Sequence, residues 1–168
     1  ATRFTAGVSI DRFLSRLFAP DLWRLLRQHL VLVFGSLAIA ALIGIPLGVL
    51  ACRRPALSGP VMALTGLLQT IPSLALLAFL IALLGTIGFV PALIALSAYA
   101  LLPIVRNTHA GLQSVASGLI EAGSALGLRR VQILRLIELP LAAPMVLAGL
   151  KTAAIINVGT ATVAAFVG

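Results

Sequence analysis

Long apolar stretches dominate the sequence, and short polar segments separate them. Residues 55–105 contain no Asp, Glu, Lys or Arg. A helix that crosses a membrane needs about 20 residues, so this uncharged run is long enough for two crossings and a turn. Glycines and a proline within residues 85–91 (Gly-Thr-Ile-Gly-Phe-Val-Pro) predict the turn between the two crossings.

Two further apolar stretches flank this run. One begins near Leu30 and ends before Arg53-Arg54-Pro55, and the other begins at Leu141 and is interrupted only by Lys151. The pattern therefore predicts an all-α fold, a polytopic membrane helical bundle. Its four spans are expected near residues 30–51, 61–84, 89–105 and 142–165, with a more polar loop over residues 106–140.

Small residues recur on one face of the first predicted span. Ala40, Gly44 and Gly48 follow one another at four-residue steps. In membranes such a face lets a second helix approach closely, so it predicts a packing surface.

Residues 1–29 form an amphipathic N-terminal segment in which arginines alternate with large apolar residues. Two amphipathic stretches, near residues 10–18 and 21–29, are separated by Ala19-Pro20-Asp21. Pro20 ends the first stretch and Asp21 can cap the second. Arg, Trp and Leu together favour a helix that lies at the lipid headgroups, and a helix packed on the bundle is the alternative.

The amino-acid composition indicates whether water or lipid surrounds this chain. Hydrophobic residues make up 61% and charged residues 10%, and the mean hydropathy is +1.17. A soluble domain carries about a quarter charged residues, so this chain is a membrane protein with the lipid bilayer around it. The formal net charge of +8 does not indicate a nucleic-acid partner, because spans separate the basic residues from one another.

The polar loop contains residues of defined type at defined spacing. Residues 121–140 read E-A-G-S-A-L-G-L-R-R-V-Q-I-L-R-L-I-E-L-P. This resembles the E-A-A…G…I-x-L-P loop of permease subunits of binding-protein-dependent ABC importers, which docks on a cytoplasmic ATPase. The loop residues that match are Glu121, Ala122, Gly123, Gly127, Ile137, Leu139 and Pro140. Gly123 departs from the pattern, because the family usually has alanine there.

Three shorter tracts narrow the resemblance to permeases for osmoprotectant uptake. They are Q-T-I-P-S at residues 69–73, L-P-I-V-R-N-T at residues 102–108 and G-T-A-T at residues 159–162. The substrates of that group are quaternary ammonium compounds such as glycine betaine, choline and carnitine.

The resemblance covers roughly residues 30–168 and implies half of a translocation pathway in an ATP-driven importer of the bacterial inner membrane. The implied partners are two cytoplasmic ATP-binding subunits, a second permease subunit, identical or homologous, and an extracytoplasmic substrate-binding protein. ATP and Mg are expected on the ATPase, with no cofactor and no enzymatic activity in this chain. The sequence agrees, because it has no G-x-x-x-x-G-K-[ST] phosphate loop. The resemblance also implies a further span beyond Gly168.

Polar residues within the spans are candidates for the pathway. Pro72 removes a backbone donor and kinks the second span, which would expose Gln69, Thr70 and Ser73 at membrane depth. A plain helix–helix hydrogen bond by Gln69 is an equally good interpretation. Lys151 is the only charge in the fourth span; it either extends to the membrane surface or faces a water-filled cavity.

Two criteria for orientation disagree. A cytoplasmic loop puts six arginines inside and leaves the five of the N-terminal segment outside, so the count of basic residues is nearly tied. The loop motif is the more specific criterion and favours a cytoplasmic loop.

Other functions remain open from the sequence, and a purely structural membrane subunit is the least specific of them. One is an ABC permease for a different small solute such as an amino acid. Another is a stand-alone secondary transporter or channel, which usually needs internal repeats or coupling charges that this sequence lacks.

Overall fold

The computed structural model describes residues 20–164, and every regular element in that range is helical. The all-α class is thereby confirmed. Residues 10–18, the first amphipathic stretch, lie outside the described range. The elements are α2 (Pro20–Arg53), α3 (Pro55–Thr70), α4 (Ser73–Leu84), α5 (Phe89–Gln113), α6 (Ser117–Ala125), α7 (Arg130–Ile133), the π-helical segment η1 (Leu134–Glu138) and α8 (Leu139–Ala164).

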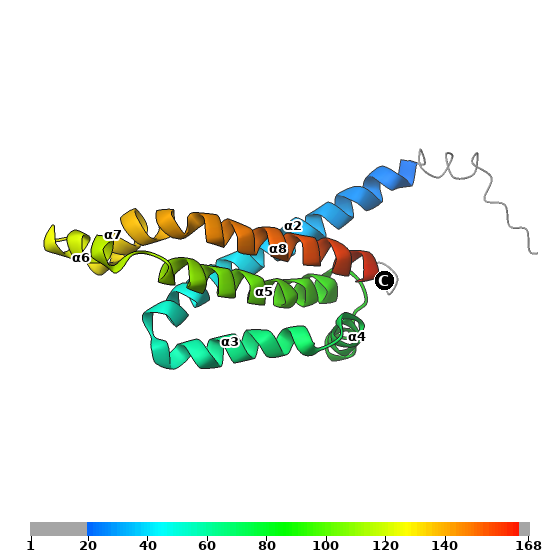
Figure 1. Ribbon diagram of the computed structural model, residues 1–168. Helices are drawn as coiled ribbons and strands as arrows, with labels where there is room; N and C mark the ends of the chain where they lie inside the picture. Colours follow the sequence, from blue (N-terminus) through cyan, green and yellow to red (C-terminus); the bar gives the residue numbers. More distant parts are fainter. Residues whose placement is uncertain (1–19, 165–168) are drawn as a thin grey trace, which may run out of the picture.

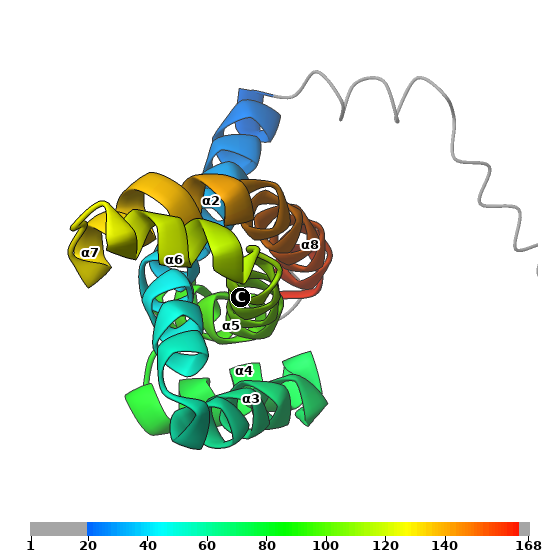
Figure 2. The same cartoon turned by 60° about the vertical axis from the view of Figure 1, so that its left-hand side comes forward.

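Three stretches are long and apolar enough to cross a membrane. They are Asp21–Arg53, Phe89–Gln113 and Arg130–Ala164, and the bent pair α3 and α4 makes a fourth if it counts as one span. Figure 1 shows α2, α5 and α8 crossing one another in a bundle, with α6 and α7 at one end. Figure 2 shows the same segment lying where α5 ends and α8 begins.

Small residues bring these three helices together, as the stripe on the first span predicts. Ala40 is fully buried, and a Cβ built on Gly48 would lie 2.6 Å from the Cβ of Thr108 on α5. A Cβ on Gly149 of α8 would lie 2.8 Å from the carbonyl oxygen of Pro103. Backbones that approach this closely gain dispersion contacts, which replace the hydrophobic effect as the cohesive force in lipid.

The first span differs from its predicted bounds, because one continuous helix runs from Pro20 to Arg53. The predicted boundary at residue 29 is wrong, since the change from polar to apolar residues there includes no glycine or proline to end a helix. At 34 residues α2 is about 51 Å long and exceeds the hydrocarbon core of about 30 Å. Its first turns stand away from the bundle and expose Trp23.

The second span is two helices rather than one kinked helix over residues 61–84. α3 and α4 meet at 94°. The break falls at Ile71 and Pro72, both of which are extended, with ψ values of 127° and 136°. Pro72 has no N–H and disfavours helical geometry in the residue before it, so the helix ends at Thr70.

The polar loop is shorter than residues 106–140, because α5 continues to Gln113 and α8 begins at Leu139. Arg106, placed at the start of the loop, is therefore an exposed residue of a helix. The third and fourth predicted spans are both extended at this end of the bundle.

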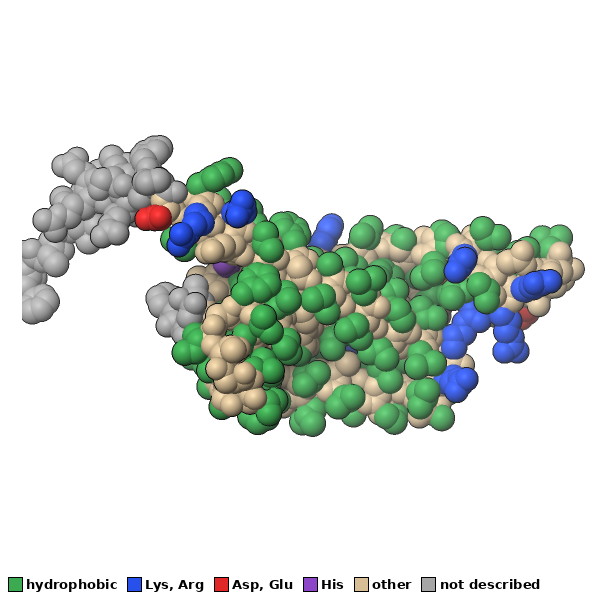
Figure 3. Space-filling view, turned by 180° about the vertical axis from the view of Figure 1, so that it is seen from behind, with side chains coloured by type: hydrophobic (Ala, Val, Ile, Leu, Met, Phe, Trp, Pro, Cys, Tyr) green, Lys and Arg blue, Asp and Glu red, His purple; other side chains and the backbone are tan. Residues whose placement is uncertain are grey.

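The ends of the bundle differ in charge. Figure 3 shows hydrophobic side chains over the middle of one face and a concentration of Lys and Arg at the end that carries α6 and α7. Arg53, Arg129 and Arg130 belong to this end, where Arg53 reaches the backbone of Arg130. We expect this end to be cytoplasmic.

Cysteine labelling tests the orientation. In a Cys52→Ser background, single cysteines at Gly59 and Ser114, both exposed, should react with a membrane-impermeant maleimide only after the cytoplasmic side is opened. A cysteine at Ile87, 70% exposed in the turn at the opposite end, should react in intact cells. The reverse pattern would contradict the orientation.

Candidate coupling site and translocation path

The motif residues at 121–127 form a helix with a defined end. α6 stops at Ala125, and Gly127 follows with φ +80°, a left-handed conformation that glycine adopts without cost. Two backbone hydrogen bonds close this end: Leu128 N–H donates to Gly123 O at 3.1 Å, and Gly127 N–H donates to Ser124 O at 3.0 Å. This is a Schellman motif, and it explains why the pattern has glycine at 127.

Gly123 and Ile137 are partners in space. Gly123 is buried on α6, and a Cβ there would lie 2.7 Å from the Cδ1 of Ile137 on η1. The spacing between these two motif positions thus reflects a contact that holds α6 against η1. The alanine that the family usually has at 123 would fit if the flexible end of Ile137 moved slightly.

Glu121 is exposed on the surface of α6. It lies in the second turn of α6, beyond the first turn in which a carboxylate would stabilise the helix dipole. The side chain is exposed and forms no salt bridge within residues 20–164. Leu119 and Leu126 beside it are 47% and 82% exposed at the polar end of the bundle. An apolar surface with one carboxylate, outside the bundle, suits a protein contact.

Leu139 and Pro140 are the first residues of α8 and directly follow the candidate coupling segment, which comprises α6, α7 and η1. Pro140 cannot donate a hydrogen bond to the carbonyl of Leu136, and its ring would crowd that oxygen in an α-helix. The chain forms the wider η1 segment directly before it, in which Leu139 N–H bonds to Leu134 O. Residues Arg130–Ala164 therefore remain one span-length helix despite the proline.

The break at Ile71 and Pro72 is held by hydrogen bonds to α5. Gln69 Nε2 donates to the carbonyl oxygen of Tyr99 at 2.9 Å, and the Tyr99 hydroxyl donates to the carbonyl oxygen of Ile71. Thr70 Oγ1 donates to Leu67 O at 2.7 Å within α3. Gln69 thus makes the interhelical bond that the sequence allowed, and Tyr99 satisfies a carbonyl that the break frees. The sequence alone gave no indication of a role for Tyr99.

The predicted pathway residues do not form one site within this chain. Ser73 and Thr160 line a small cavity between α4, α5 and α8. Lys151 lies nine residues before Thr160 on α8, which is two and a half turns and places it on the opposite face. Its exposed side chain makes no hydrogen bond within the described range. A pathway that includes both faces of α8 needs a second subunit.

A larger groove opens at the end of the bundle opposite α6. It has a volume of about 640 Å³ and is lined by α2, α4, the start of α5 and the end of α8. None of the predicted pathway residues lines it. Its walls are mainly leucine and isoleucine, with His29 the one ionisable group, so it resembles a lipid-facing or helix-facing surface more than a polar path.

A buried polar pair ties α2 to α8. Asn157 is fully buried, and its Nδ2 donates to Ser36 Oγ at 2.8 Å. Ser36 in turn donates to Val33 O at 2.9 Å. Both residues lie in apolar stretches and carry no motif, so the sequence did not reveal them.

Residues 44–168 match the family model described as "Binding-protein-dependent transport system inner membrane component". The chain belongs to this family. It is therefore a multi-pass inner-membrane permease component, and the assignment made from the loop motif is confirmed.

Curated relatives carry osmoprotectant names. The chain is 42% identical over 141 residues to the choline transport system permease protein OpuBB of Bacillus subtilis strain 168, covering 84% of the chain and 64% of that protein. It is 45% identical over 142 residues to the glycine betaine/carnitine/choline permease protein OpuCD of the same strain, covering 84% and 61%. The osmoprotectant import permease protein OsmY of Salmonella typhimurium strain LT2 matches 98% of the chain and 70% of its own length at 45% identity. The chain thus spans somewhat less than two thirds of the first two relatives.

Solved structures share the fold. An inward-facing conformation of the MetNI methionine ABC transporter is 32% identical, with a TM-score of 0.70 over 84% of this chain and 73% of that chain. A second crystal form of the same transporter gives 0.71 over 83% and 72%.

Proposed function

We propose that this permease component forms half of the translocation pathway of an ATP-driven importer for a quaternary ammonium osmoprotectant. The observation that carries the proposal is the fully formed coupling segment, with its exposed Glu121 and Leu126 presented at the basic end of a membrane bundle. The names of the relatives support the substrate class.

In the proposed importer, separate proteins hydrolyse ATP, deliver the substrate and form the pathway. Two separate ATPase subunits bind ATP and Mg and hydrolyse the nucleotide, and α6 docks on one of them. A substrate-binding protein delivers the osmolyte from outside. A second permease subunit, identical or homologous, completes the pathway. Residues on opposite faces of α8, such as Lys151 and Thr160, can then both take part in it.

Competition for uptake tests the substrate class. Cells that carry the complete system should take up labelled glycine betaine, choline or carnitine, and unlabelled methionine should not compete. Competition by methionine, or uptake of methionine alone, would instead favour an amino-acid permease, the alternative suggested by the likeness to MetNI.

A bulky substitution at Ser73 tests whether the break between α3 and α4 lines the translocation pathway. Ser73 begins α4 at the break and is half-buried against the small cavity that Thr160 shares. Ser73→Trp overfills this site, where overpacking costs about 1–3 kcal/mol, and should lower import sharply while the complex still assembles. Ala75→Trp, an exposed position two residues further on, is the matched control. Equal import by both variants would assign the break a packing role only.

A further inference from the structure

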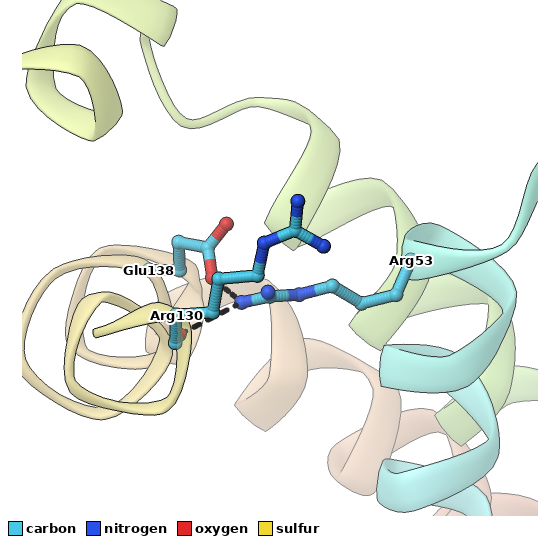
Figure 4. Close-up of polar contacts among 3 residues, drawn as sticks. All are labelled: Arg53, Arg130 and Glu138. Atoms are coloured by element: carbon cyan, nitrogen blue, oxygen red, sulfur yellow. Dashed lines mark hydrogen bonds and ion pairs between the residues drawn. The ribbon is translucent and has the colours of Figure 1, made fainter. Parts of the chain in front are cut away.

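One salt bridge connects the first span to the coupling segment. Arg53 is the last residue of α2 and Glu138 is the last residue of η1, and their side chains form the single salt bridge within residues 20–164. Arg53 Nη2 also lies 3.5 Å from the carbonyl oxygen of Arg130 on α7. Figure 4 shows the Arg53 guanidinium reaching from α2 to both groups.

The pair is partly enclosed, unlike most surface ion pairs. The Glu138 side chain is 12% exposed and that of Arg53 is 33% exposed. A carboxylate so removed from water depends on its partner, because an uncompensated charge in that position is costly. Arg53 is the group that compensates this charge within the described residues.

The contacts around the pair form a continuous path. Gly123 of α6 packs on Ile137, which precedes Glu138 in η1. Glu138 binds Arg53, and two residues after Arg53 Pro55 begins α3. The start of α3 is in turn held to α5, since Ser58 Oγ lies 3.2 Å from His109 Nε2.

We propose that Arg53 and Glu138 are positioning residues that transmit movement of α6 to the corner between α2 and α3. The inference rests on the proposed function, in which an ATPase displaces α6. η1 is the element that receives this displacement, because Ile137 contacts α6 at Gly123 and the next residue is Glu138. Through α3 the movement reaches the break at Ile71 and Pro72, where the pathway is proposed to lie.

The test measures ATP hydrolysed per substrate imported by the complete complex in liposomes. Arg53→Gln and Glu138→Gln should each raise this ratio by about threefold or more, a coupling effect expected of residues in one contact network, while the ATPase still copurifies. The double variant should be no worse than the more affected single variant, because one lost contact cannot be lost twice. Arg54→Gln is the matched control, since Arg54 is exposed and makes no salt bridge in the described range.

An unchanged ratio for Arg53→Gln, additive losses in the double variant, or an equal rise for Arg54→Gln would overturn the proposal. If Arg53→Gln does not assemble, Glu138→Gln decides the question, because it keeps the size of the side chain and an acceptor oxygen. Failure of the proposed function itself has a different signature: the unaltered complex would then show no ATP-driven import of any quaternary ammonium compound.

Discussion

Glu121→Lys and Gly127→Trp should each reduce import, and substrate-stimulated ATP hydrolysis with it, to near background. Glu121 is exposed on α6 and forms no salt bridge within residues 20–164, so the reversal places the opposite charge in the proposed contact with the ATPase. Truncating one partner of a buried interfacial charge pair costs about 2–5 kcal/mol, which is more than tenfold in affinity.

Gly127→Trp acts through the backbone. Its φ of +80° costs an L-residue about 1–2 kcal/mol, and the large side chain protrudes beside Leu126 at the docking surface. Both variants should insert into the membrane normally, because α6 lies outside the spans. Uptake of labelled substrate and the ATPase rate of the purified complex measure the effect.

Ser124→Ala is the matched control for this pair. Ser124 is exposed on the same helix, and only its backbone carbonyl takes part in the helix end. It should import at the normal rate. Normal import by Glu121→Lys and Gly127→Trp as well would mean that α6 does not couple to an ATPase.

Gly48→Leu should prevent a stable bundle. A Cβ at Gly48 would already lie 2.6 Å from the Cβ of Thr108 and 3.0 Å from the carbonyl oxygen of Val105. Since one of these contacts is backbone, side-chain rotation cannot relieve it, and α2 must move away from α5. The cost should exceed the 1–3 kcal/mol typical of overpacking. We expect a large loss of thermal stability in detergent, or no accumulation in the membrane.

Gly66→Leu makes the same substitution where space is free. No atom lies within 4 Å of a Cβ at Gly66, so this variant should unfold at nearly the same temperature as the unaltered protein. Equal stability of the two leucine variants would contradict the close crossing of α2 and α5.

Hydropathy predicted the helical class and the long apolar helices α2, α5 and α8, because lipid permits little else in an apolar chain. It did not predict the break that divides the second expected span into α3 and α4. The residues at which the spans end could not be predicted as well from hydropathy. Polar residues before Leu30 end the apolar window without ending the helix, and α5 likewise continues beyond Arg106. A helix stops where backbone geometry requires it, as at Pro72, and hydropathy does not report that geometry.

Residues of the candidate site could be predicted from the sequence where they act on the backbone at their own position. Gly127 and Pro140 act on their own backbone, so the motif singled out both residues, although it did not predict that a helix ends at the first and that α8 begins beside the second. Contacts between distant segments were not predictable in the same way. Tyr99 with Ile71 and Arg53 with Glu138 depend on how whole helices cross, and single residues gave no signal for them. The approach of Ser73 to Thr160 likewise became evident only from the packing of α4 near α8.

Accumulation of substrate in liposomes tests the central claim most directly. The complete complex, reconstituted with its substrate-binding protein, should concentrate labelled glycine betaine or choline only when ATP and Mg are supplied on the side of α6. Adding an ion gradient in place of nucleotide should produce no accumulation. Accumulation driven by an ion gradient without ATP would contradict the account and identify the chain as part of a secondary transporter.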